Sequence, residues 1–459
     1  MSISNKIVKA GIGYTVGNIL VKGAVFLTLP IFTRLMTPDN FGMYSIFLTY
    51  ANIIFIFTGC CLQNTIKNAF YDFKEKIDDY VESLIIFNVF VTAILLTIIL
   101  LFDILSNKIF YILLALQAFS ISMFSIFNVY LSIFYEYKTY IKVSCFNTMV
   151  SILLSILFLL NDFFENRYMG RVWGTVIPYL ISSGYIFYYF YNRSNKIYEH
   201  RYIKYGLSFS TPLIIHGLST IILGQIDTIV IQRYCGNIET GLFTFALIYN
   251  TIFVIITSSV INAWGPWLFS ALNEERFFDA KQKSKLFFEM ILFFSLILML
   301  LIPEITMILA DKAYEGSIQM SMPLVMSGYM MFLYQSFVNV EYYYKKTSYI
   351  AVGSILSAIF NFILAYLLIP TYGVWTAPFI HLGSYVVYAG FHLYYAKKLA
   401  DVFDVNNIVW CSVTCLLIMS MAIFFKDNIF IRFFILLIIV ERYYNLGIFK
   451  AAYLMSKKV

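Results

Sequence analysis

The stretch IFTRLMTPDNFGMYSIFLTY, from Ile31 to Tyr50, decides the fold, because its pattern returns 199 residues later. The second copy is VIQRYCGNIETGLFTFALIY, from Val230 to Tyr249. Each copy lies at the end of an apolar run. If each run crosses a membrane, the chain crosses it six times between the two copies, so both copies have the same orientation. A repeat in one orientation predicts two parallel halves, an architecture that transporters commonly use. The aligned identities are Arg34 with Arg233, Gly42 with Gly241, Leu48 with Leu247 and Tyr50 with Tyr249.

The composition is that of a membrane protein. Of the 459 residues, 61% are hydrophobic and only 12% are charged, whereas a soluble domain carries about 25% charged residues. The apolar residues, about 280 in all, would furnish roughly fourteen spans of about 20 residues each. This excludes a soluble enzyme, a disulfide scaffold, a disordered chain and a nucleic-acid module. The six cysteines form no CxxC pair and no His/Cys cluster with metal spacing, so no metal site is expected.

Fourteen apolar runs are separated by charged or turn-rich breaks. Backbone groups in lipid must be satisfied internally, and alternating β segments are absent, so the runs predict helices. The predicted fold is all-α, with two pseudo-symmetric six-helix halves (1–200 and 201–400) and two further helices (401–459). The runs are 10–32, 43–66, 82–102, 109–134, 143–161, 171–191, 207–231, 240–264, 287–309, 320–344, 349–369, 373–395, 408–425 and 429–447.

The loops alternate in basicity, which predicts the orientation. With the N-terminus in the cytoplasm, inside segments hold 23 of the 32 Lys and Arg residues and outside segments hold 8. The remaining one, Lys22, lies within a span. This asymmetry places both termini in the cytoplasm. The longest connection, about 265–286, is expected to be a cytoplasmic loop.

No pattern for catalysis stands out. The sequence has no GxxxxGK[ST] phosphate loop, so the chain is not expected to hydrolyse ATP. It has no outer loop or soluble domain that could hold the acceptor of a glycan polymerase. We therefore expect a transporter rather than an enzyme, without a cofactor, driven by a proton or sodium gradient.

Lys22 is the central site candidate, because a charge in hydrocarbon costs about 2.5–3.5 kcal/mol even on the lenient insertion scale. It lies about 18 Å along the first span at 1.5 Å per residue. At 100° per residue it shares an arc of roughly 60° with Thr15 and Asn18. This stripe predicts a binding site for an anionic head group, with Lys22 and Asn18 in contact with it. The alternative for Lys22 is an ion pair that holds two helices together. Glu341 and His381 are weaker candidates for functional residues.

Five other polar residues complete the predicted site. Arg34 and Arg233 would lie at the outer mouth, where anchoring to lipid phosphates is the alternative interpretation. Lys67 would lie at the inner end, where a positive-inside residue is also expected. His216 would contact the substrate or only form a structural hydrogen bond. Asp227 is the candidate for ion coupling, with helix-to-helix attachment as the alternative.

Three stretches resemble the polysaccharide-export flippases of the multidrug/oligosaccharidyl-lipid/polysaccharide (MOP, MATE-like) exporter superfamily. The first is PIFTRLMTPDNFGMYS, Pro30 to Ser45, which is similar to the family's first-span exit. The second is STPLIIHGLSTIILGQIDTIVIQRYCGNIETGLFTFALIYN, Ser210 to Asn250, which looks like its seventh span. The third is NFILAYLLIPTYGVWTAPF, Asn361 to Phe379, similar to its turn between spans 11 and 12.

The resemblance implies a Wzx-type flippase in the inner (plasma) membrane of a bacterial cell. Such a protein moves undecaprenyl-diphosphate-linked oligosaccharide units to the outer leaflet, for O-antigen (lipopolysaccharide) or capsule synthesis, by alternating access through a cationic central cavity. Membrane lipids, a polysaccharide polymerase and a chain-length regulator would be its partners. The alternatives are a MATE-like small-molecule exporter, a lipid II exporter and a membrane glycan polymerase. The cationic Lys22 argues against export of cations.

Overall fold

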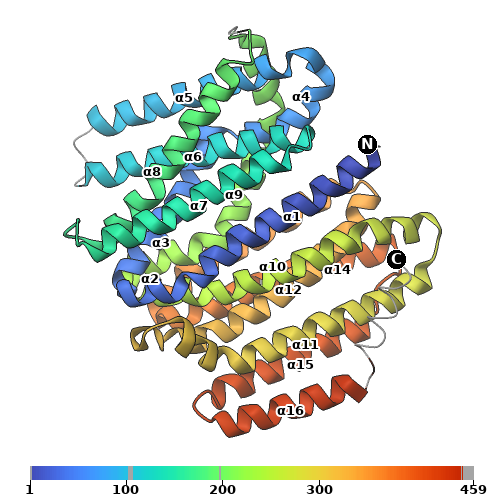
Figure 1. The fold of residues 1–459 in the computed structure, drawn as a ribbon. Coiled ribbons are helices and arrows are strands. Elements are labelled where there is room, and N and C mark those ends of the chain that lie inside the picture. Colours follow the sequence, from blue (N-terminus) through green and yellow to red (C-terminus); the bar gives the residue numbers. More distant parts are fainter. Residues whose placement is uncertain (1–2, 102–106, 196–197, 446, 448–459) are drawn as a thin grey trace. The chain divides into compact units, whose positions relative to one another are not determined.

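The computed structural model describes residues 3–101, 107–195, 198–445 and 447, and almost all of them are helical (Figure 1). These residues include no β-strand. A helix coincides with each of the fourteen predicted runs. Within the described part of the chain, ten helices are long and apolar enough to cross a membrane. The all-α prediction is confirmed, and the number of crossings stays a prediction.

The chain divides into two compact units, Met1–Ile221 and Ile222–Val459. The division falls within α9 (His200–Tyr234) rather than at residue 200. The three-part division into 1–200, 201–400 and 401–459 stays a prediction, and its last part is described only as far as residue 447.

The N-terminal unit is a bundle of long helices with two short helical linkers. Its elements before α9 are α1 (Ile3–Leu27), α2 (Leu29–Leu35), α3 (Pro38–Gly59), η1 (Leu62–Thr65), α4 (Ile66–Phe73), η2 (Lys74–Lys76), α5 (Ile77–Leu101), α6 (Lys108–Ile133), α7 (Tyr137–Leu160) and α8 (Arg167–Tyr191).

The C-terminal unit follows a similar order and adds two helices at its end. Its elements after α9 are α10 (Asn237–Asn273), α11 (Phe277–Leu309), η3 (Lys312–Tyr314), α12 (Ser317–Tyr343), α13 (Thr347–Tyr372), η4 (Val374–Thr376), α14 (Ala377–Leu399), α15 (Val405–Phe424) and α16 (Ile429–Asn445).

The helix contacts repeat from one unit to the other. In the N-terminal unit α6 packs against α3, α5 and α8, and α7 packs against α8. In the C-terminal unit α12 packs against α10, α11 and α14, and α13 packs against α14. The two sets match when α3 corresponds to α10, as the repeat of 199 residues requires. Each unit is thus built around one central helix, α6 or α12.

The repeated sequence forms a sharp turn between two helices in each unit. In the first copy Thr37 caps α3, accepting a hydrogen bond from the Asn40 backbone N–H, and Pro38 occupies the first turn. Pro suits this position because the N–H that it lacks would have no helical partner. In the second copy Gly236 stands before α10 with φ 96°, a conformation that favours glycine. The two copies therefore form the same turn with different residues, Thr37 and Pro38 in the first copy and Gly236 in the second.

The second predicted span, 43–66, is interrupted. The helix α3 ends at Gly59, and Cys60 and Cys61 both adopt left-handed conformations, with φ of 46° and 53°. Such backbone is costly for residues other than glycine and persists only when the surroundings enforce it. Cys61 is buried, and its thiol lies 3.8 Å from the carbonyl oxygen of Leu213 in α9.

The prediction of a long loop over residues 265–286 is wrong. The helix α10 continues to Asn273, α11 begins at Phe277, and only three residues connect them. Charged residues ended the apolar run in the sequence, but charges end the lipid-facing part of a helix rather than the helix itself. Both helices therefore continue beyond their apolar segments.

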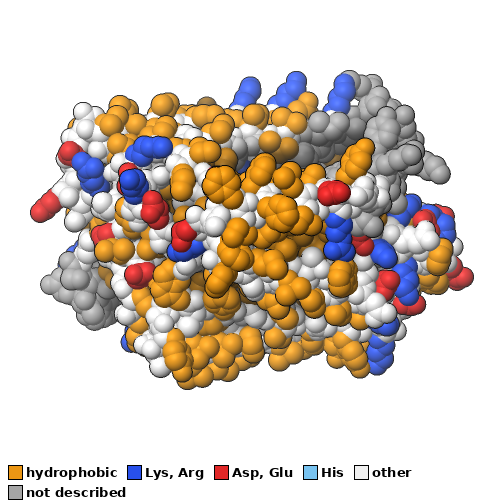
Figure 2. Space-filling view, turned by 90° about the horizontal axis from the view of Figure 1, so that it is seen from below, with side chains coloured by type: hydrophobic (Ala, Val, Ile, Leu, Met, Phe, Trp, Pro, Cys, Tyr) orange, Lys and Arg blue, Asp and Glu red, His pale blue; other side chains and the backbone are white. Residues whose placement is uncertain are grey.

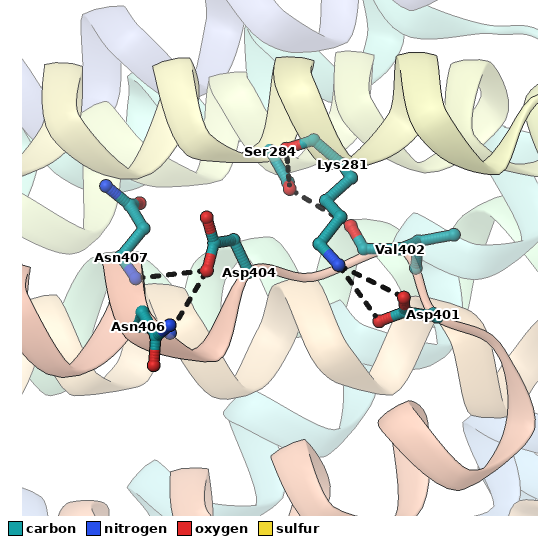
Figure 3. A network of polar contacts seen from close by, with 7 residues as sticks. All are labelled: Lys281, Ser284, Asp401, Val402, Asp404, Asn406 and Asn407. Atoms are coloured by element: carbon teal, nitrogen blue, oxygen red, sulfur yellow. Dashed lines mark hydrogen bonds and ion pairs between the residues drawn. The ribbon is translucent and has the colours of Figure 1, made fainter.

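The helix α15 is fastened to α11 by a polar network (Figure 3). Asp404 caps α15 by accepting hydrogen bonds from the backbone N–H groups of Asn406 and Asn407. Ser284 of α11 donates to the carbonyl of Val402 at 3.1 Å. Lys281 forms an ion pair with Asp401, 3.0 Å away.

The helix α16 is held by a second polar contact to α11. The guanidinium of Arg432, only 4% exposed, makes two bonds to the Glu304 carboxylate at 2.5 and 2.7 Å. It also donates to the carbonyl of Leu300. Figure 2 shows hydrophobic side chains covering much of the visible face, with charged side chains gathered mainly toward its two ends. Such a surface suits contact with lipid.

Candidate functional site

The predicted cationic residues of the N-terminal unit all lie on its surface. Lys22 is exposed on α1, and no hydrogen bond or ion pair to it occurs among the described residues. Arg34 is exposed on α2 and donates to the carbonyl of Pro30 at 2.9 Å. Lys67 is exposed on α4, beyond the interruption at Cys60. The interhelical ion pair considered for Lys22 is absent from the described part of the chain.

Asn18 connects the polar stripe of α1 to the interior of its unit. Its side-chain oxygen accepts a hydrogen bond of 2.6 Å from the hydroxyl of Tyr140 on α7. Tyr140 is buried, and its ring lies 6.2 Å from that of Phe124 on α6. Thr15, the third residue of the stripe, bonds only to the carbonyl of Gly11 within α1.

The predicted residues on α9 have different surroundings. His216, in the N-terminal unit, is half-buried. Arg233 is exposed, with its guanidinium 5.6 Å from the centroid of the Tyr234 ring. Asp227 is 1% exposed and faces the interior of the C-terminal unit. The described structure places Asp227 in a polar cluster and leaves Arg233 at the surface.

The Asp227 cluster joins three helices. One carboxylate oxygen lies 2.9 Å from Nδ1 of His381 on α14, which is 3% exposed. The same oxygen accepts a hydrogen bond of 3.4 Å from the Asn361 amide on α13. The other carboxylate oxygen has no partner among the described residues. A buried carboxylate beside an imidazole can hold or release a proton, which makes the cluster the candidate ion-coupling site.

A second acid–histidine pair lies in the same unit. Glu341 on α12 and His392 on α14 are both fully buried, with Oε1 and Nδ1 2.8 Å apart. A Cβ atom on Gly353 would lie 2.7 Å from Nε2 of His392, so the glycine makes room for the imidazole. This pair ties α12 to α14.

His392 was not predicted as a site residue, although the sequence carries a signal for it. The chain has four histidines, and two of them, His381 and His392, lie eleven residues apart on one helix. At 100° per residue they share a face within about 20°. Aromatic rings fill the space between the two pairs, with Tyr334 stacked on Tyr388 at 4.2 Å. No group of three or more His, Cys, Asp or Glu side chains suited to a metal occurs in the described residues.

Comparison with known proteins identifies the family. A family model described as "Polysaccharide biosynthesis protein" matches residues 7–272, more than half of the chain. The chain belongs to this family. The predicted membership of a polysaccharide biosynthesis family is thereby confirmed.

Individual relatives agree with this assignment. The "Lsg locus putative protein 1" of Haemophilus influenzae is 24% identical over 369 residues, covering 77% of this chain and 89% of the relative. An uncharacterized membrane protein of the same organism is 24% identical over 362 residues, covering 75% and 86%.

Two solved structures share the fold. The lipid II flippase MurJ, in an inward closed conformation, superposes with a TM-score of 0.66 and 15% identity, covering 95% of this chain and 99% of MurJ. An inward-facing multidrug resistance MATE family transporter of the MOP superfamily gives a TM-score of 0.55 and 15% identity, covering 87% and 94%. The predicted MATE-like fold is confirmed.

Proposed function

We propose that this member of the polysaccharide biosynthesis family is a flippase. Its substrate is an undecaprenyl-diphosphate-linked oligosaccharide, which it carries to the outer leaflet of the bacterial inner membrane for O-antigen or capsule synthesis. Lys22 is the observation that carries the proposal, because an exposed lysine without an ion pair on an apolar helix needs an anionic partner or water. A diphosphate linked to a lipid supplies that partner.

The proposal gives the other predicted site residues the following roles. Arg34 and Arg233 attract the diphosphate at the outer mouth, and Lys67 and His216 contact it from the inner side, with Asn18 beside Lys22. A polysaccharide polymerase and a chain-length regulator receive the product in the outer leaflet. Both termini lie in the cytoplasm.

The driving ion is a proton bound at Asp227. The carboxylate faces the imidazole of His381 and the amide of Asn361, so nitrogen atoms lie where a hard metal cation such as sodium would need oxygen ligands. Each proton that moves down a membrane potential of 100 mV supplies about 2.3 kcal/mol. No cofactor is needed.

Reconstituted transport tests the proposal. Proteoliposomes would carry fluorescent undecaprenyl-diphosphate-linked oligosaccharide, and the labelled lipid reaching the opposite leaflet would be measured. We expect Lys22→Ala to reduce the rate at least tenfold and Lys22→Arg to preserve most of it, because a cation is retained. Lys142→Ala, which removes an exposed lysine of α7, is the matched control and should transport normally.

Two outcomes would contradict this proposal. Wild-type rates in Lys22→Ala would remove Lys22 from the mechanism. Lipid II is the second candidate substrate, supported by the fold shared with the lipid II flippase. Faster movement of lipid II than of the oligosaccharide lipid would replace the proposed substrate with lipid II.

A further inference from the structure

The N-terminal unit contains a polar cavity that the proposed function does not yet use. It has a volume of about 410 Å³ and lies among α1, α3, α6, α7 and α8. This volume is within the range of about 300–1,000 Å³ that is typical of small-molecule sites. Its polar wall includes Asn52, Gln117, Asn147, Arg171 and Thr175.

Each of two buried amides of this wall has one atom without a hydrogen-bond partner among the described residues. Gln117 is 2% exposed and Asn147 is 1% exposed. Oε1 of Gln117 and Nδ2 of Asn147 have no partner among the described residues, although Oδ1 of Asn147 accepts a hydrogen bond from Ser182. A buried polar group without a partner costs about 1–3 kcal/mol. Both residues line the cavity, so a ligand there that both donates and accepts hydrogen bonds would supply the partners that this acceptor and this donor lack.

Arg171 is held at one end of the cavity by aromatic rings. It is 9% exposed, and its guanidinium carbon lies 3.8 Å from the centroid of the Phe32 ring and 4.4 Å from that of Tyr44. The Tyr44 hydroxyl shares a hydrogen bond of 3.0 Å with Thr175, one turn further along α8. The rings fix the cation by cation–π attraction and cover its faces.

The internal repeat gives this cavity a counterpart in the C-terminal unit. Thr28, on the cavity wall, precedes Asp227 by the same 199 residues that relate the two repeated stretches. Arg171 is the fifth residue of α8, and His381 is the fifth residue of the matching helix α14. In the C-terminal unit the Asp227 carboxylate bonds to both His381 and Asn361. In the N-terminal unit the equivalent positions, Thr28 and Arg171, line the cavity.

The chemistry of the lining selects the class of ligand. Arg171 is the single charged residue among the described residues of the wall, so an organic cation would be repelled. A small inorganic anion could accept from Arg171 and from Nδ2 of Asn147, but it could not donate a hydrogen bond to Oε1 of Gln117. A sugar ring carries hydroxyl groups that donate and accept, and its C–H face can pack on an aromatic ring such as Phe124 or Tyr179.

We propose that this cavity is a binding site for one sugar residue of the transported glycan, in contact with Gln117, Asn147 and Arg171. The site lies within the N-terminal unit and is distinct from the diphosphate contacts proposed for Lys22. The identity of its ligand rests on the proposed function. The N-terminal unit is then the part of the chain that recognises the sugar. The C-terminal unit uses the equivalent positions for the buried acid and histidine.

Protection from a thiol reagent tests the site without transport. The full chain in detergent would carry Ser151→Cys, a substitution in the cavity wall, and its reaction with N-ethylmaleimide would be compared with the background of the wild-type cysteines. We expect N-acetylglucosamine, glucose or glucuronic acid at millimolar concentration to slow labelling severalfold, and sodium diphosphate to leave it unchanged. Saturation-transfer NMR on the same sugars gives a second reading that needs no introduced thiol.

Gln117→Leu is the decisive variant. It removes an acceptor that has no internal partner, so the melting temperature should stay the same or rise, while sugar protection and the NMR signal are lost. Ser144→Ala is the matched control, because Ser144 also has a buried hydroxyl without a partner among the described residues but does not line the cavity. It should keep both signals.

The outcomes separate this proposal from the proposed function. Protection by diphosphate but not by sugars, sugar binding that survives Gln117→Leu, or no sugar signal by NMR would each overturn the sugar site. Sugar binding by a chain that moves no oligosaccharide lipid in proteoliposomes would instead overturn the flippase proposal and leave the sugar site standing.

Discussion

At the scale of single residues, burial distinguishes the two kinds of charge that this chain carries in its apolar helices. Lys22 is exposed and has no ion pair among the described residues, whereas Asp227 is buried against His381. An exposed cation on an apolar helix must find a partner outside the protein. A buried acid with an imidazole already has a partner, and what it can exchange is a proton.

Asp227→Asn should uncouple transport from the proton gradient. The amide keeps the shape of the carboxylate but cannot bind and release a proton, so stimulation of transport by a pH gradient should fall at least tenfold. Proteoliposomes with an imposed pH gradient, with or without a sodium gradient, provide the measurement.

Glu341→Gln is the matched control for this change. It alters the other buried acid–histidine pair of the unit and should retain stimulation by the pH gradient. If Asp227→Asn responded to the gradient as the wild type does, Asp227 would only attach α9 to α13 and α14. A response to sodium alone would show that the ion is not a proton.

At the scale of helices, a partly buried ion pair between Arg432 and Glu304 attaches α16 to α11. Arg432→Met should lower the free energy of unfolding by about 3 kcal/mol, because it leaves the Glu304 carboxylate without its cation. We take the lower end of the range for buried pairs because Glu304 is about one third exposed. Thermal and denaturant unfolding in detergent would measure the change.

The double variant Arg432→Met/Glu304→Met completes this test. Two apolar side chains of similar length should recover most of the lost stability, since replacing both partners removes the unpaired charge. Additive losses from the two single changes would show that the pair does not hold α16 to α11.

At the scale of the whole molecule, the orientation in the membrane is open to direct labelling. The three-residue connection between α10 and α11 is predicted to be cytoplasmic, so Glu275→Cys should resist a membrane-impermeant maleimide in intact cells. Lys312→Cys, in a connection predicted to be outside, should react readily. Efficient labelling of Glu275→Cys from outside would reverse the proposed orientation.

The sequence predicted the helical fold because length and hydropathy alone determine whether a segment can cross lipid. It placed Lys22 and Asp227 as candidates because a charge stands out in an apolar run. It could not predict the role proposed for Arg171, because this residue begins the apolar run 171–191, where a charge at the boundary of a span is ordinary. Gln117 and Asn147 were not predicted as site residues either, because only the three-dimensional structure shows that each has a buried amide atom without a hydrogen-bond partner among the described residues.

The correspondence of Thr28 with Asp227 and of Arg171 with His381 bears on how such a chain could arise by gene duplication. Both copies keep the same helical scaffold, and their specialisation is concentrated in a few side chains at one equivalent place. Ancestral reconstruction of this family can therefore concentrate on those positions, because the order in which they diverged dates the moment when the two copies ceased to be interchangeable.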